Sequence, residues 1–254
     1  MKMNCRFLTV FCTSLILWGH VPCCLSAAEC EGLTALRITL SELRAADWDE
    51  GVYIHYNVFV DGNENAAVLD VEDEFRMFSS RDELRLISNR VQLHQTEDVS
   101  VRIIASTKTI NLADGISVEE GLAEHVRQIA WLVQDELLSG DAVAECRLVD
   151  SPGGRSAWRV KFHLTPVMRR MFSGPIEVAS IQYTVDAESA RLREYRVDYV
   201  EGARVKSTTY VINQFNLNAD RPDDWPDVDE VVFDGDAVRP EFAFWTVQDV
   251  RKRN

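Results

Sequence analysis

Long stretches of strict two-residue alternation constrain the fold of this chain more than any other feature. The first stretch begins after Gly51 and places apolar residues at every second position: Val52, Ile54, Tyr56, Val58 and Val60. Successive side chains of a strand point to opposite faces of a sheet, so this pattern predicts a strand with one apolar face. The same alternation predicts strands over 158–164, 176–185, 195–199 and 209–217. A chain built from such segments folds around a sheet.

Shorter apolar runs predict the remaining strands. They cover 67–77, 84–87, 91–93, 99–104, 109–112 and 142–149. Most are separated by only a few charged or small polar residues. Parallel pairing needs a long crossover connection, so these short connections predict an antiparallel meander.

Two segments have the period of an amphipathic helix instead. Residues 33–48 repeat leucine at spacings of three and four, and residues 117–139 follow a capping box at Ser117 to Glu120 and end before Gly140. The predicted class is therefore α+β: a curved antiparallel sheet with two main amphipathic helices packed in or over its concave face. One stripe of the second helix would face the sheet: Leu122, Val126, Ile129 and Val133.

The N-terminus has the three parts of a secretory signal. Lys2 and Arg6 precede an apolar run over 7–18, and Ser26-Ala27-Ala28 supplies small residues for a peptidase. We expect cleavage after Ala28 and export to the periplasm or cell envelope. A buried N-terminal helix and a lipid anchor on a cysteine are the alternatives. No later apolar run reaches the roughly 20 residues of a spanning helix, so a soluble or peripheral protein is expected.

The remaining chain divides into a sheet domain over 29–219 and an acidic tail over 220–254. The tail is expected to be a solvated loop with Trp225 packed down, a short strand over 231–233 and one more element over 242–250. Its carboxylates could hold calcium, but their order is not that of a calcium-binding loop, so we expect no metal. A formal net charge of −14 argues against nucleic acid as a partner and leaves a basic protein partner open. A monomer is expected.

Two cysteines stay after signal cleavage, Cys30 and Cys146. In an exported chain such a pair favours one disulfide bond, with two free thiols as the alternative.

No catalytic signature is present. The chain has no Gly-x-Ser-x-Gly elbow, no phosphate loop and no dinucleotide fingerprint. Its histidines outside the signal are too far apart in sequence for a local metal pair: His55, His94, His125 and His163. We expect no enzymatic activity and no cofactor, and keep an enzyme with a dispersed carboxylate and histidine site as the last hypothesis.

The strand faces are rich in aromatic and aliphatic side chains, and two interpretations stay open. These side chains either form a core under the helices or line a concave apolar groove under the helix at 117–139. The candidate groove residues are Trp158, Val160, Phe162, Ile181, Tyr183, Tyr195, Tyr199, Val211 and Phe215.

The order of these elements resembles a known family. The strand from Trp158 to Pro166 and the three strands over 181–186, 192–199 and 209–215 are similar to those of the LolA/LolB-type periplasmic lipoprotein carriers. The resemblance covers residues 33–233 and implies a half-barrel that holds acyl chains without covalent chemistry. It favours an exported carrier or sensor of an apolar ligand. The alternative is an envelope protein-interaction module with a covered sheet.

Overall fold

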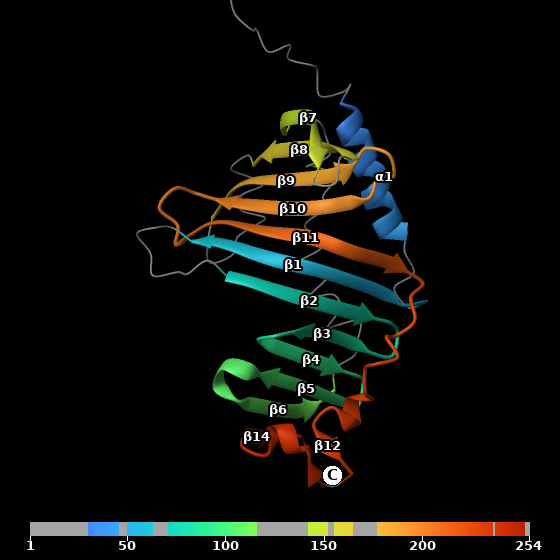
Figure 1. The fold of residues 1–254 in the computed structure, drawn as a ribbon, viewed down its shortest axis with the longest axis vertical. Helices are drawn as coiled ribbons and strands as arrows, with labels where there is room; N and C mark the ends of the chain where they lie inside the picture. Colours follow the sequence, from blue (N-terminus) through green and yellow to red (C-terminus); the bar gives the residue numbers. More distant parts are fainter. Residues whose placement is uncertain are drawn as a thin grey trace, which may run out of the picture.

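The structure is a computed structural model that describes residues 30–45, 50–62, 71–115, 142–151, 155–164, 177–235 and 237–251. One large 12-stranded sheet dominates it (Figure 1), in the order β14-β6-β5-β4-β3-β2-β1-β11-β10-β9-β8-β7. All neighbouring strands are antiparallel except β14 and β6, which are parallel. The predicted antiparallel sheet is confirmed, and its twist is visible along the vertical axis of Figure 1.

The strands before residue 116 form one half of the sheet: β1 Val52–Gly62, β2 Val71–Ser79, β3 Leu84–Ser88, β4 Val91–Gln95, β5 Val99–Ile104 and β6 Thr109–Asp114. The strands between residues 142 and 218 form the other half: β7 Val143–Ser151, β8 Arg155–His163, β9 Val178–Asp186, β10 Leu192–Tyr199 and β11 Val205–Leu217. Strand β11 pairs with β1 along its length and joins the two halves.

The junction between the halves requires a glycine. Gly51 has a φ of 99°, which side-chain-bearing residues rarely adopt, and its carbonyl accepts the Ala219 N–H at 3.0 Å. A Cβ at this position would collide with the carbonyl oxygen of Ala219. The closure of β1 against β11 therefore depends on this residue.

The helix α1 (Glu31–Ala45) packs across β7, β8 and β9. Its leucines at 33, 36 and 40 are at most 2% exposed and lie in one core cluster with Phe162 and Tyr183. We call this side of the sheet the α1 face. Strand register places Val160 opposite Tyr183 and Phe162 opposite Ile181, so all four side chains share it.

A disulfide bond joins Cys30, just before α1, to Cys146 on β7, with the Cα atoms 6.4 Å apart. This is the pair expected from the sequence. Gly32 lies beside it, and a Cβ there would be 2.8 Å from the Cβ of Trp158. The helix start is thus fastened to the last strands of the sheet both covalently and by close packing.

The C-terminal segment packs on the opposite side, which we call the tail face. Val228, Val231 and Val232 are buried against Val101 and Ile110. The segment contains η6 (Val228–Glu230), β12 (Phe233–Asp234), β13 (Ala237–Val238), η7 (Pro240–Phe242) and β14 (Thr246–Asp249). Trp225 is 4% exposed, as expected. The solvated loop expected here is wrong for Val228, which is buried with Val231 and Val232 against the apolar face of β5 and β6.

Two further tail expectations are changed by the structure. A strand was expected over 231–233, but strand pairing begins at Phe233, because Val231 and Val232 continue the turn that starts with Val228–Glu230. The element expected over 242–250 contains β14, which extends the main sheet in parallel with β6. More than a hundred residues separate these two strands in sequence, which leaves ample chain for the crossover of a parallel pair.

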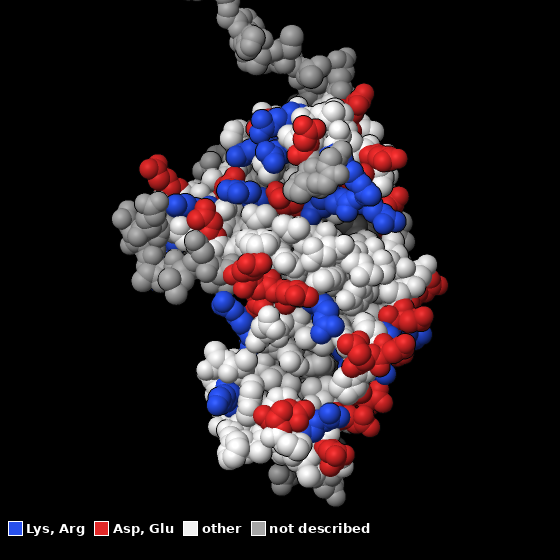
Figure 2. All heavy atoms as spheres, in the orientation of Figure 1, with Lys and Arg blue, Asp and Glu red and all other residues white. Residues whose placement is uncertain are grey.

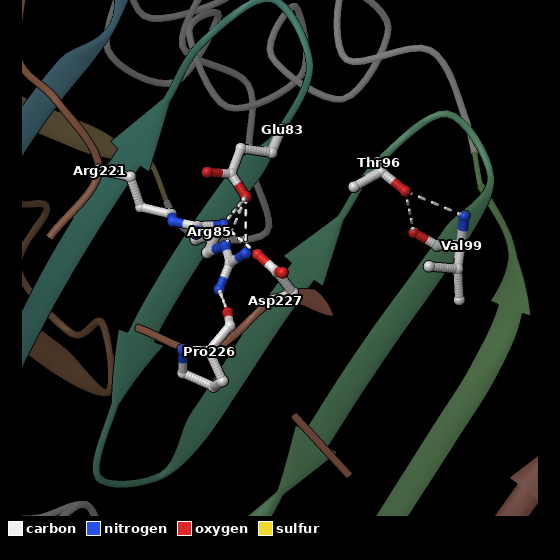
Figure 3. Close-up of polar contacts among 7 residues, drawn as sticks. All are labelled: Glu83, Arg85, Thr96, Val99, Arg221, Pro226 and Asp227. Carbon is white, nitrogen blue, oxygen red and sulfur yellow. Dashed lines mark hydrogen bonds and ion pairs between the residues drawn. The ribbon is translucent and has the colours of Figure 1, made fainter. Parts of the chain in front are cut away.

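Two arginines, Arg85 and Arg221, link the tail to the start of β3 (Figure 3). Arg85 is fully buried, and its Nε donates to Glu83 at 2.8 Å while another guanidinium nitrogen donates to the Pro226 carbonyl. Arg221 lies 2.8 Å from Asp227 and 3.7 Å from Glu83. In the loop between β4 and β5, the Val99 N–H donates a hydrogen bond to the Thr96 hydroxyl at 3.2 Å and closes the loop. A buried guanidinium without these acceptors would be strongly unfavourable, so the tail completes the β3 side of the fold.

The helix expected over 117–139 lies outside the described residues, together with Leu122, Val126, Ile129 and Val133. In the described part of the chain, α1 is the one α-helix, and no helix there is long and apolar enough to cross a membrane.

Candidate ligand-binding cavity

A cavity of about 670 Å³ lies on the α1 face, where the end of α1 meets the middle of the sheet. Its walls come from β10, β11, β1 and β2. The apolar and aromatic lining residues are Ile54, Tyr56, Met77, Leu192, Tyr195, Tyr210, Ile212, Phe215 and Leu217. Ligand sites are commonly about 300–1,000 Å³ and mostly apolar, so this cavity has the size and lining of such a site.

A β-bulge shapes the wall that β11 contributes. His55 of β1 pairs with Gln214, but the next residue, Tyr56, pairs with Ile212, which leaves Asn213 as an extra residue. A bulge bends its strand and reverses the alternation beyond it. Ile212 before the bulge and Phe215 after it therefore both face the cavity.

Polar residues form the rest of the lining. Thr39 and Glu42 come from α1, Arg191 and Arg193 come from the turn before β10 and the start of that strand, and several amide side chains come from the end of β11. The Thr39 hydroxyl donates to the Ala190 carbonyl and ties the helix to the turn. The cavity is thus apolar along the sheet and polar where helix and turn meet, which suits an amphiphilic molecule.

Asp186 holds the turn that builds this polar border. Its carboxylate accepts the Ser189 N–H at 2.8 Å, the Arg193 guanidinium at 2.9 Å and the Glu188 N–H at 3.1 Å. These donors, the Ser189 N–H first, hold the pKa of Asp186 well below its usual range. The carboxylate is therefore ionised at every pH where the protein would work, and the border is preformed.

Aromatic rings run across the sheet beside the cavity. The ring of Tyr195 is 5.6 Å from that of Tyr210, which is 6.2 Å from that of Tyr56. Tyr56 in turn stacks on Phe75 at 5.3 Å. Burial, followed by the neighbouring tyrosines, raises the pKa of all three tyrosines above its ordinary value. They are neutral at physiological pH, so this row of aromatic side chains carries no charge.

The structure divides the nine groove residues predicted from sequence. Tyr195 and Phe215 line the cavity. The others on the α1 face contribute to the core beside or under α1 instead: Trp158, Val160, Phe162, Ile181, Tyr183 and Tyr199. Val211 lies on the tail face, because it pairs with Glu194 while its neighbour Tyr210 pairs with Tyr195.

The groove residues predicted from sequence do not include Tyr210 and Ile212 for the same reason. Straight alternation along 209–217 puts Val211 and Phe215 on one face, and only the extra residue at Asn213 separates them. The bulge has one sequence signal, the polar pair Asn213-Gln214 inside an otherwise alternating strand, and this signal does not identify its position.

Other candidate chemistry does not gather at the cavity. His55 bonds Glu74 at 2.8 Å, and buried His94 lies 3.2 Å from Gln92. His163 is exposed at the end of β8, and His125 lies outside the described residues. Within the described ranges, no group of three or more histidine, cysteine or carboxylate side chains is arranged to hold a metal ion.

Comparisons with known proteins give structural similarity alone. No family model matches the chain, and no curated protein matches it in sequence. An uncharacterized conserved protein from Thermus thermophilus is 12% identical with a TM-score of 0.36, covering 87% of this chain and 98% of its own.

Two further solved structures carry descriptive names. A putative outer membrane lipoprotein-sorting protein domain from Vibrio parahaemolyticus is 10% identical with a TM-score of 0.31, covering 76% of this chain and 94% of its own. A LolA superfamily protein from Nitrosomonas europaea is 5% identical with a TM-score of 0.26, covering 76% of this chain and 95% of its own. Similarity this low says nothing about a ligand, which has to be inferred from the cavity itself.

Proposed function

We propose that this protein is an exported, non-enzymatic carrier or sensor that binds an apolar or amphiphilic molecule in the cavity on the α1 face. The observation that carries the proposal is the cavity: about 670 Å³, walled by apolar and aromatic side chains and bordered by polar ones. Burial of an apolar molecule there would supply the main binding energy, at roughly 25 cal/mol per Å² of buried apolar surface.

Export is part of the proposal and is supported by the N-terminal signal pattern and by the disulfide bond between Cys30 and Cys146. Disulfides persist in oxidising compartments such as the periplasm. The sequence resemblance adds lipoprotein acyl chains to the candidate ligands.

The alternative is an interaction module that meets a basic partner through an acidic surface. The face shown in Figure 2 carries both acidic and basic side chains at either end of the sheet, with a broad uncharged area between them at the level of β11 and β1. This face offers a basic partner no continuous acidic patch, whereas the cavity supports the carrier or sensor.

Two neighbouring residues provide a matched test. Ile212→Trp would fill the cavity, whereas Val211→Trp would place the same side chain on the tail face. We expect the wild type and Val211→Trp to bind N-phenyl-1-naphthylamine, an uncharged apolar dye, with a blue-shifted emission, and Ile212→Trp to lose at least tenfold in affinity. Equal binding by both variants would refute the cavity as the site, and no binding by the wild type would refute the function.

A further inference from the structure

Three tyrosines from three adjacent strands form a row along the cavity wall. Tyr195 of β10 lies directly opposite Tyr210 of β11, and Tyr56 of β1 lies on the other side of Tyr210. All three residues line the cavity. Each ring therefore brings a hydroxyl group to the border of a largely apolar space.

These hydroxyl groups have no acceptor in the described part of the chain. The nearby hydroxyl of Tyr199, by contrast, lies 3.3 Å from the Thr208 hydroxyl and has a partner. Buried polar groups in proteins are nearly always hydrogen-bonded, by protein, water or ligand. The structure also contains buried polar atoms that have neither solvent access nor a partner, and among the described residues none of the three phenol oxygens is one of them. Each phenol oxygen is therefore accessible from the cavity.

The hydroxyl groups act as donors toward whatever enters. Burial raises the pKa of each phenol, so the proton stays on the oxygen at neutral pH. A saturated hydrocarbon would displace water from these donors and give no acceptor in return. A carbonyl oxygen accepts up to two hydrogen bonds and would replace that water.

We propose that the cavity is selective for an apolar molecule whose body carries a carbonyl group, which accepts hydrogen bonds from the row formed by Tyr56, Tyr195 and Tyr210. This inference rests on the proposed function, since it concerns the same cavity, and it adds the class of ligand. The carbonyl could belong to an ester, as in an acylated lipid, or to a ketone, as in an isoprenoid quinone. Both present the same acceptor.

The test compares three competitors of matched chain length: undecane, 2-undecanone and methyl decanoate. Each is titrated against bound N-phenyl-1-naphthylamine in the wild type, in the triple variant Tyr56→Phe, Tyr195→Phe, Tyr210→Phe, and in Tyr199→Phe. The phenylalanines keep every ring and remove only hydroxyl groups. Tyr199→Phe is the matched control, because its hydroxyl is already bonded and the residue does not line the cavity.

We expect a carbonyl competitor to displace the dye from the wild type at roughly five- to tenfold lower concentration than undecane, the size of about one net hydrogen bond. The triple variant should lose this difference while its affinity for undecane stays the same, and Tyr199→Phe should retain it. Preference for the ester alone would assign an acyl ester, and preference for the ketone alone would assign a ketone. Either result supports the proposal.

Equal displacement by all three competitors in the wild type would overturn the inference and leave the proposed function intact. The inference would also be overturned if the triple variant kept the full preference for the carbonyl competitors over undecane. Failure of the wild type to bind the dye or any competitor would overturn both. If the triple variant does not fold by circular dichroism, Tyr210→Phe at the centre of the row replaces it, with a partial loss of the difference expected.

Discussion

The two ends of the sheet are covered on opposite faces, and the cavity lies between the two covers. At one end α1 packs on the α1 face of β7, β8 and β9, with an aliphatic and aromatic core and a disulfide bond. At the other end the tail packs on the tail face of β3 to β6, with buried valines and a hydrogen bond from buried Arg85 to the Pro226 carbonyl. Neither of these covers extends over the α1 face of β11 and β1.

This difference shows how one strand pattern gives two outcomes. Tyr183 and Tyr195 are opposite each other on β9 and β10 and share a face. Tyr183 lies in the α1 core and is fully buried, whereas Tyr195 lines the cavity. Alternation fixes which face a side chain takes, and the position where α1 ends decides whether that side chain becomes core or site.

The largest expected effect separates core from cavity. Phe162 is fully buried and packs edge-on against Tyr183 at 5.7 Å, so Phe162→Ala should lower the free energy of unfolding by about 3–5 kcal/mol. Phe215→Ala should cost only about 1–2 kcal/mol, because one side of that ring already faces the cavity. Urea unfolding monitored by circular dichroism measures both. Equal costs would mean that the cavity wall is ordinary core.

A pH-dependent effect should belong to the tail-covered end. His94 is 2% exposed and lies opposite Arg85, and burial, followed by the Arg85 charge, lowers its pKa from 6.5 to about 4. The unfolded chain takes up a proton near pH 6.5 and the folded chain only near pH 4. Stability should therefore fall by about 3 kcal/mol as the pH drops through this window.

His94→Gln removes this titration and keeps a polar side chain that can bond Gln92. The variant should show a smaller loss of unfolding free energy between pH 7 and pH 4.5 than the wild type. Parallel pH profiles for the two proteins would show that His94 titrates normally. A His163→Gln control at the exposed end of β8 should leave the profile of the wild type unchanged.

The smallest effect concerns the fastening of α1. Gly32→Ala places a Cβ 2.8 Å from the Cβ of Trp158, and overpacking of this kind costs about 1–3 kcal/mol, offset in part by a helix-propensity gain of about 1 kcal/mol. We expect Gly32→Ala to unfold at a lower temperature than the wild type in thermal denaturation. Thr34→Ala on the exposed side of the same helix should be neutral or slightly stabilising. A Gly32→Ala variant as stable as the wild type would show that α1 can shift away from β8 and accept the added Cβ without cost.

Local patterns predict much of this fold. The strand positions, the apolar stripe of α1 and the pairing of Cys30 with Cys146 follow from alternation, helical spacing and cysteine count. The site is harder to predict, because a single extra residue at Asn213 reverses the faces of β11, and the length of α1 sets which side chains this helix buries. The bulge and the parallel pairing of β14 with β6 both depend on contacts between distant segments.

The most direct test of the central claim is native mass spectrometry of the protein purified without detergent, before and after organic extraction. We predict a bound species that extraction removes, present on the wild type and on Val211→Trp and absent from Ile212→Trp. A wild-type protein that carries only its own mass, and gains none after incubation with a total lipid extract, would contradict the claim that the cavity holds an apolar ligand.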